Sequence, residues 1–295
     1  MNRVLFVLFF LFFLVINSQV RQEIYSITDS ICEAYNKIPT HHISEKNSKD
    51  INQLQRFRSD LALKAKDHEL VYIYKNDSRP LIKIEVLKEI FNRNQIDKLK
   101  LFKETVHFTD EIKLLPGEEL YPIQCIFFDK LTYDETSSEL SEDLVEYVFR
   151  SEPLNLSLIE NIQHKIPSTD KYYKKVRKLT IENRSVLLLS FIASLKNEKD
   201  IDLIKSFGIN SFAAIQVFPD EQFIPFLESL VKIENLDHEY LSLAARFCKD
   251  PKSNSLIYKI FETLKGSRAQ LSLFESLLKD NKCRLKYEKE ANLKR

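Results

Sequence analysis

Apolar residues recur at helical spacing through the second half of the chain, in short segments that each follow an Asp, Ser or Asn. The clearest apolar stripe consists of Leu256, Ile257, Ile260, Phe261 and Leu264. A neighbouring stripe consists of Leu241, Ala244, Ala245 and Cys248. This spacing predicts amphipathic helices of about a dozen residues. Helices this short and this closely spaced cannot bury their stripes alone, so we expect them to stack side by side as an all-α solenoid.

Helix boundaries in this half carry recognisable signals. Asp200, Asp220 and Asp237 stand where each would cap a following helix, and Gly208 stands where a helix end favours positive φ. Val186–Leu195 is apolar almost all round, which indicates a helix covered on more than one side. The predicted helix starts recur in pairs at about thirty residues, close to the periods of known helical repeats.

The first half also predicts helices, with less regular spacing. They are expected at about 24–35, 50–65, 80–91, 122–131 and 136–149. The run Glu69–Tyr74 is ambiguous, because its composition fits a strand and its length also allows a helix ending near Asn76. We expect irregular structure around Thr109–Gly117, whereas Pro153–Asp170 has no clear pattern.

The N-terminus has the features of an export signal. Arg3 supplies a positive charge, Val4–Ile16 is an unbroken apolar run, and a polar exit follows, with cleavage expected after Ser18 or Gln19. The run is shorter than the roughly 20 residues that span a bilayer. We therefore expect an extracytoplasmic protein, periplasmic or secreted, with no membrane span after cleavage; the alternative is a membrane tether through an uncleaved N-terminal segment.

Two segments of the chain carry a family resemblance. They are Asn76–Ile90, which contains Ile82 and Lys83, and Lys196–Leu230, which contains Asp200, Phe212, Ala213 and Pro219. In these segments the sequence resembles the HEAT-repeat family, especially its divergent exported bacterial members. The resemblance implies a right-handed α-solenoid of stacked antiparallel helical hairpins that binds partners along one face and has no fixed activity.

These patterns predict four regions along the chain. They are a signal peptide at 1–19, an N-terminal helix and linker at 20–50, a HEAT-like repeat domain at 51–281 and a basic tail at 282–295. We expect the basic tail to be a solvated chain end.

The four cysteines would be in an oxidising compartment if the protein is exported. They are Cys32, Cys125, Cys248 and Cys283. Three pairings are possible, and we favour Cys248 with Cys283 because that bridge would clip the last repeat. The competing interpretation treats Cys125 and Cys248 as small buried residues on helix stripes.

Composition excludes several classes of function. The chain has three glycines where average usage would give about twenty, so glycine-rich phosphate loops and glycine-lined oxyanion turns cannot form. The 44 Lys and Arg residues balance 43 Asp and Glu residues, so no overall field attracts nucleic acid. No cofactor motif and no metal-ligand spacing occurs; in particular, His41 and His42 lack a third ligand.

One cluster of aromatic and basic residues is the only candidate binding site. It consists of Tyr172, Tyr173, Lys174, Lys175, Arg177 and Lys178. Such side chains are frequent in protein and glycan contacts, although a solvated helix face with Val176 turned inward is the simpler interpretation. Asp200 and Asp202 could suggest a divalent cation or sugar-nucleotide site, but both fall in one first helical turn, where we expect them to act as caps. Sequons begin at Asn76, Asn155 and Asn183, about as many as chance would give.

The sequence therefore predicts an exported, non-catalytic binding or assembly scaffold that recognises a protein partner. The alternative is an exported hydrolase whose active site is assembled only in three dimensions, with His107 or His164 beside two carboxylates.

Overall fold

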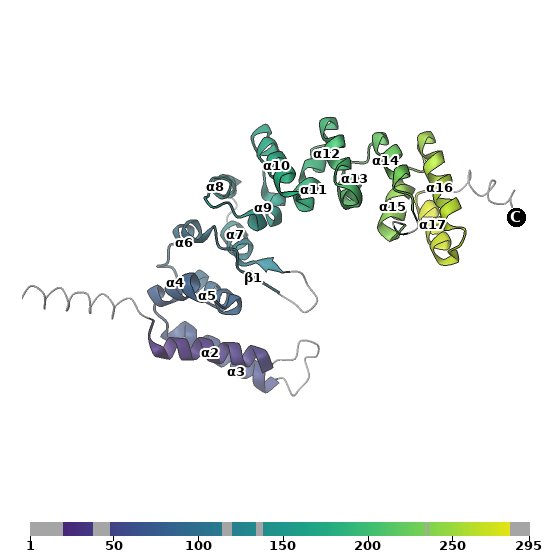
Figure 1. Ribbon diagram of the computed structural model, residues 1–295. Coiled ribbons are helices and arrows are strands. Elements are labelled where there is room, and N and C mark those ends of the chain that lie inside the picture. Colours follow the sequence, from purple (N-terminus) through teal and green to yellow (C-terminus); the bar gives the residue numbers. More distant parts are fainter. Residues whose placement is uncertain are drawn as a thin grey trace, which may run out of the picture. The chain divides into compact units, whose positions relative to one another are not determined.

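The computed structural model describes residues 20–37, 48–113, 120–133, 138–232, 234 and 236–283. The chain divides into two compact units, residues 1–165 and 166–295, coloured purple to teal and green to yellow in Figure 1. Helices make up most of both units, so the predicted all-α class is confirmed. The repeat pattern predicted a single domain at 51–281, whereas the compact units divide after Lys165. The predicted signal segment with Ser18 and Gln19, and the tail from 284, lie outside the described residues.

The first unit contains eight described α-helices and a minimal hairpin. The helices are α2 (Gln22–Lys37), α3 (Ser48–Lys64), α4 (Asp67–Asn76), α5 (Pro80–Asn92), α6 (Lys98–Thr105), α7 (Ile123–Tyr133), α8 (Ser138–Val148) and α9 (Leu156–Asn161), followed by the 3₁₀ turn η2 (Gln163–Lys165). Helix α2 packs against α3, α4 packs against α5, and α5 also contacts α2 and α7. The ambiguous run Glu69–Tyr74 is helical, within α4.

The only strands among the described residues are β1 (Glu111–Ile112) and β2 (Tyr121–Pro122). They pair antiparallel, with Glu111 opposite Pro122 and Ile112 opposite Tyr121. Part of the stretch expected to be irregular therefore forms a hairpin. Lys83 of α5 contacts the residues that lead into β1. The Lys83 Nζ donates to Asp110 at 2.7 Å and lies 5.0 Å from the centre of the Phe108 ring.

Aromatic rings form the centre of the first unit's core. The Phe127 ring of α7 makes edge contacts with Tyr74, Phe91 and Phe102, at centroid distances of 5.6, 5.5 and 5.4 Å. The edge-to-face arrangement is favourable because the positive ring edge meets the negative face. The buried Tyr74 hydroxyl accepts a hydrogen bond from Gln124 Nε2 at 3.0 Å, and burial raises the pKa of Tyr74.

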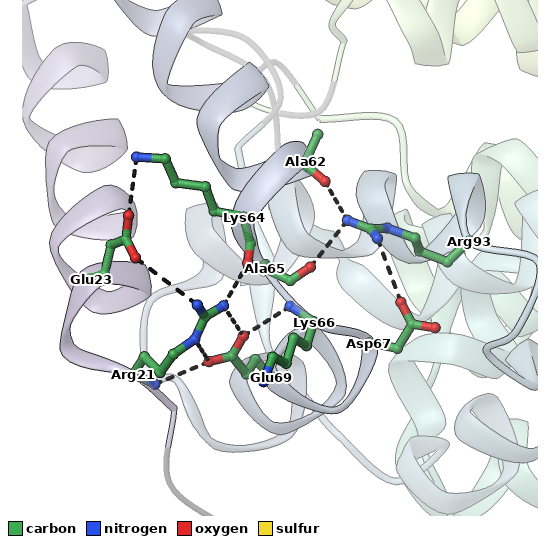
Figure 2. A network of polar contacts seen from close by, with 9 residues as sticks. All are labelled: Arg21, Glu23, Ala62, Lys64, Ala65, Lys66, Asp67, Glu69 and Arg93. Atoms are coloured by element: carbon green, nitrogen blue, oxygen red, sulfur yellow. Dashed lines mark hydrogen bonds and ion pairs between the residues drawn. The ribbon is translucent and has the colours of Figure 1, made fainter.

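A buried carboxylate joins the start of α2 to the α3–α4 turn (Figure 2). Glu69 accepts hydrogen bonds from Arg21 Nε at 2.9 Å, Arg21 Nη2 at 2.8 Å and the Lys66 amide at 2.8 Å. Arg21 also donates to the Lys64 carbonyl at 2.5 Å. The Arg21 hydrogen bond is the main cause that lowers the pKa of Glu69 to about 2. In the same view, Arg93 donates to the carbonyls of Ala62 and Ala65.

A second buried carboxylate joins α2, α3 and α5. Glu85 accepts hydrogen bonds from Arg58 Nε at 2.7 Å, Tyr35 Oη at 2.9 Å and Lys88 Nζ at 2.7 Å. Burial and the neighbouring Glu85 carboxylate raise the pKa of Tyr35 to about 12. Burial alone would raise the pKa of Glu85, but the two cations lower it. A half-buried arginine and a lysine thus compensate the charge of a carboxylate that water barely reaches.

The second unit consists of two rows of short helices (Figure 1). They are α10 (Asp170–Asn183), α11 (Val186–Ser194), α12 (Ile201–Lys205), α13 (Phe212–Val217), α14 (Ile224–Ser229), α15 (His238–Arg246), α16 (Asn254–Leu264) and α17 (Arg268–Asp280). We call α11, α13, α15 and α17 the odd row and the others the even row. Neighbours within the odd row pack side by side, α14 packs against α16, and α10 pairs with α11. The odd-row helices begin at residues 186, 212, 238 and 268, a repeat of 26 to 30 residues.

The predicted apolar stripes form the core between the rows. Leu256, Ile257, Ile260 and Leu264 are all fully buried, as are Leu241, Ala244 and Ala245 of the neighbouring stripe. Two of the predicted caps are confirmed, since Asp220 accepts from the Gln222 amide at 2.9 Å and Asp237 from the Tyr240 amide at 2.8 Å. Gly208 has φ of 62°, the positive value expected there. Among the described residues, no helix combines the length and apolar character needed to cross a membrane.

Candidate binding surface

Asp200 has a different role from the predicted cap. Its carboxylate makes no cap hydrogen bond; it accepts from Tyr173 Oη and from Arg177 Nε, each at 2.8 Å. Asn197 extends the network by donating to Tyr173 Oη at 3.2 Å. The capping prediction is wrong for Asp200, because its carboxylate oxygens accept from Arg177 and Tyr173 of α10 instead of from backbone amides. Asp202 lies in the same helical turn with its side chain 97% exposed.

This contact divides the predicted aromatic and basic cluster into three parts. Tyr173 and Arg177 face inward to Asp200. Tyr172 is buried, with the ammonium groups of Lys171 and Lys175 at 5.4 and 5.9 Å from its ring centre. Lys174 and Lys178 are exposed, and Lys178 lies 3.8 Å from Glu182. The structure therefore does not present the six side chains together on one surface.

The cysteines are distributed over both units. Cys248, just after α15, and Cys283, after α17, form a disulfide with their Cα atoms 6.0 Å apart. This is the pairing that the sequence analysis favoured, and it ties the last hairpin to the one before it. Cys32 is a half-buried free thiol on α2, and Cys125 is a fully buried free thiol on α7 whose pKa burial raises.

The two histidines of the alternative hypothesis lie at the surface. His107 is exposed and makes an edge contact with the Phe108 ring at 5.0 Å, and His164 is exposed in the 3₁₀ turn η2. Three surface depressions in the first unit, of about 400, 230 and 310 Å³, are lined by other residues. Within the described ranges, no three His, Cys, Asp or Glu side chains are grouped so that they could hold a metal ion.

Successive hairpins of the second unit are tied together through backbone carbonyls at helix ends. Arg184 Nη2 donates to Ser206 O at 2.8 Å while its guanidinium lies 4.3 Å from the centre of the Phe207 ring. Two further bonds of this kind link Arg246 Nη1 to Gln216 O at 2.8 Å and Lys259 Nζ to Glu228 O at 2.9 Å. The neutral Gln270 Nε2 donates to Leu236 O at 3.1 Å, just before the start of α15. The last carbonyls of a helix lack intrahelical partners and carry its negative dipole end, so a cation there is favourable. These ties fix each hairpin against the preceding or following one.

The exposed positions of both rows include charged and uncharged side chains. The even row exposes the charged side chains of Lys174, Lys178, Asp202, Lys259 and Glu262, and Glu221 and Lys252 are exposed in the 3₁₀ turns just before α14 and α16. The odd row has small or aliphatic side chains at many solvent-facing positions: Leu187 and Ser194 on α11, Ala213 and Val217 on α13, and Ala269, Ser272 and Ser276 on α17, with Ser190 and Ser242 half-buried beside them. We call this set the odd-row face. The same row also exposes Glu239, Arg246, Arg268, Glu275, Lys279 and Asp280, which do not belong to the set. The residues of the odd-row face repeat at helical spacing opposite the buried stripes, a sequence signal that differs from the clusters of charged and aromatic residues.

Comparison of the chain with protein-family models, with curated proteins and with solved structures finds no match.

Proposed function

We propose that the protein is an exported scaffold whose second unit is a HEAT-like, right-handed solenoid and which binds a protein partner along the odd-row face. Export rests on the apolar N-terminal run, and the alternative of an uncleaved tether would still place the scaffold outside the cytoplasm. The repeat architecture is supported by the row packing and by the 26- to 30-residue recurrence of hairpins.

The observation that carries this proposal is the recurrence of small and aliphatic solvent-facing side chains from one odd-row helix to the next. Serine and alanine allow another backbone to approach closely, and covering them does not remove a charged group from water. Leu187 is 49% exposed and Val217 is 42% exposed, each on a neighbouring helix of the row. Complete burial of such a side chain is worth about 1.5 to 3 kcal/mol, so covering the exposed halves would contribute about 1 kcal/mol each.

Rigidity strengthens the same argument. A partner that binds a preorganised surface does not have to order it, so less of the contact energy is lost. The carbonyl ties and the Asp200 network hold consecutive hairpins in place before any partner arrives. The hydrolase alternative needs a cavity in which a histidine meets two carboxylates. His107 and His164 line none of the three depressions described above.

The test compares two charged double variants of the purified protein. Leu187→Glu with Val217→Glu alters the odd-row face, and Ile181→Glu with Tyr258→Glu alters comparably exposed positions on the even row. Each is used to capture proteins from the native envelope or culture fluid, and the recovered partner is then titrated by calorimetry. We expect the odd-row variant to bind at least about tenfold more weakly and the even-row variant to bind normally. Capture of no specific partner by the wild type, or equal binding by both variants, would refute the proposal.

A further inference from the structure

A depression of about 310 Å³ in the first unit brings together tyrosines from two helices. Its lining residues are Tyr25 of α2, Tyr72, Ile73 and Asn76 of α4, and Asp77, Ser78 and Arg79 of the turn that leads to α5. The volume is at the lower end of the range for small-molecule sites, so there is room for one ring-sized ligand. The site belongs to the first unit alone and is independent of the odd-row face.

The charged groups of this depression satisfy each other. Arg79 donates to Asp77 through Nε at 2.9 Å and Nη2 at 2.7 Å, and its Nη1 donates to Asp29 at 2.6 Å. Asp77 Oδ1 also accepts from the Arg79 amide at 2.8 Å. The hydrogen bond to Asp77 is the main cause that raises the pKa of Arg79, so the pair stays ionised. Every nitrogen of the guanidinium and both carboxylate oxygens already make at least one hydrogen bond, so a charged ligand gains less from either group than from an unpaired one.

The neutral polar groups, in contrast, are uncommitted. Among the described residues, the hydroxyls of Tyr25, Tyr72 and Ser78 and the Oδ1 of Asn76 make no hydrogen bond, although Asn76 Nδ2 donates to the Tyr72 carbonyl at 2.8 Å. Burial, together with the nearby Tyr72 and Asp77, raises the pKa of Tyr25, so its hydroxyl remains a neutral donor and acceptor. Three hydroxyls and one amide oxygen therefore line a single depression beside two phenol rings.

We propose that this depression binds one residue of a neutral carbohydrate. A sugar ring offers hydroxyls that donate and accept in turn, which matches the uncommitted tyrosine, serine and asparagine groups. Its C–H faces suit the apolar flanks of Tyr25 and Tyr72, since aromatic side chains combine an apolar body with a polar tip. An anionic or cationic ligand would compete with the closed Arg79–Asp77 pair and gain little. For so open a site we expect a dissociation constant on the order of 1 mM.

Saturation-transfer NMR on the purified protein tests this site, with N-acetylglucosamine, methyl glucoside and glucose 6-phosphate as probes. We expect transfer to at least one neutral sugar and no tighter binding of the phosphorylated one. Tyr72→Ala removes a side chain that is 39% exposed and should weaken binding about tenfold or more, whereas Tyr25→Phe, which deletes one hydroxyl, should weaken it about three- to tenfold. Tyr133→Ala, at an 88% exposed tyrosine on α7, should leave it unchanged. Circular dichroism of each variant verifies the fold.

Three outcomes overturn the proposal. One is the absence of transfer to both neutral sugars, and another is equal transfer in folded Tyr72→Ala and in the wild type. The third is tighter binding of glucose 6-phosphate than of the neutral sugars, which would mean that Arg79 is available to an anion.

Discussion

Loss of the disulfide between Cys248 and Cys283 should destabilise the second unit by about 4 kcal/mol. The bond closes a loop over a sequence separation of 35 residues. A cross-link across about 35 residues lowers the entropy of the unfolded chain by about 13 cal/mol/K, which is about 4 kcal/mol at 25 °C. Little native packing should be lost in Cys283→Ser, because Cys283 is only half-buried and Cys248 remains in the core.

Urea unfolding followed by far-ultraviolet circular dichroism measures this effect, since the chain has no tryptophan for fluorescence. The oxidised wild type should have a higher midpoint than Cys283→Ser, and reducing agent should remove the difference. The free energy of unfolding should also change less steeply with urea concentration in the oxidised wild type, because the cross-linked unfolded chain exposes less surface. Cys32→Ser is the matched control: it changes a free thiol on α2, so it should retain the full response to reductant.

Two results would contradict this reasoning. If oxidised wild type and Cys283→Ser differ by less than about 1 kcal/mol, loop closure does not stabilise this unit. If Cys283→Ser still responds to reductant and Cys32→Ser does not, the bond formed in solution involves a different pair.

Three further predictions concern buried groups. Glu69 has its folded pKa lowered from 4.5 to about 2, so its stabilisation is complete above about pH 4.5 and is lost as the pH falls towards 2. With allowance for the exposure of Arg21, that loss should be about 1 to 2 kcal/mol in acid unfolding curves, and Glu69→Gln should flatten the curve in this window; an unchanged curve would contradict the assignment. Asp200→Asn should cost about 1 to 3 kcal/mol in urea unfolding, whereas Asp202→Asn should stay within about 0.5 kcal/mol; equal effects would mean that Asp200 acts as an ordinary surface group. Ile260→Ala, at a fully buried position in α16, should cost about 2 to 5 kcal/mol, against less than about 0.5 for the exposed Lys259→Ala, and similar losses would argue against the core described here.

The helices could be predicted from the sequence because periodicity depends only on local residues. The run at Glu69–Tyr74 shows where this reaches its limit: its residues fit either a strand or a helix until a neighbour is known. In the structure Leu70, Ile73 and Tyr74 share one helix face against the core, and Glu69 turns to Arg21. The β1–β2 hairpin, with two residues in each strand, is too short to produce an alternating pattern.

The candidate surface was harder to predict than the fold. The charged and aromatic residues of α10 predicted a binding site there. In the structure Tyr173 and Arg177 instead donate hydrogen bonds to Asp200, which lies on another hairpin. Asp237 and Asp200 both precede a helix in the sequence, and only Asp237 caps one. Local sequence cannot distinguish these two aspartates, because the difference depends on which side chains the preceding hairpin places beside them.

The carbonyl ties also explain how hairpins can stack regularly when their sequences do not repeat regularly. A side-chain pair between hairpins requires two matched residues at fixed positions. A tie to a backbone carbonyl requires only one long donor close to it, because helix ends and turns leave carbonyls accessible to side chains. Arg184, Arg246, Lys259 and Gln270 satisfy this with three residue types at four different positions in their helices or turns. Such ties allow the hairpins to stack alike while their sequence pattern varies.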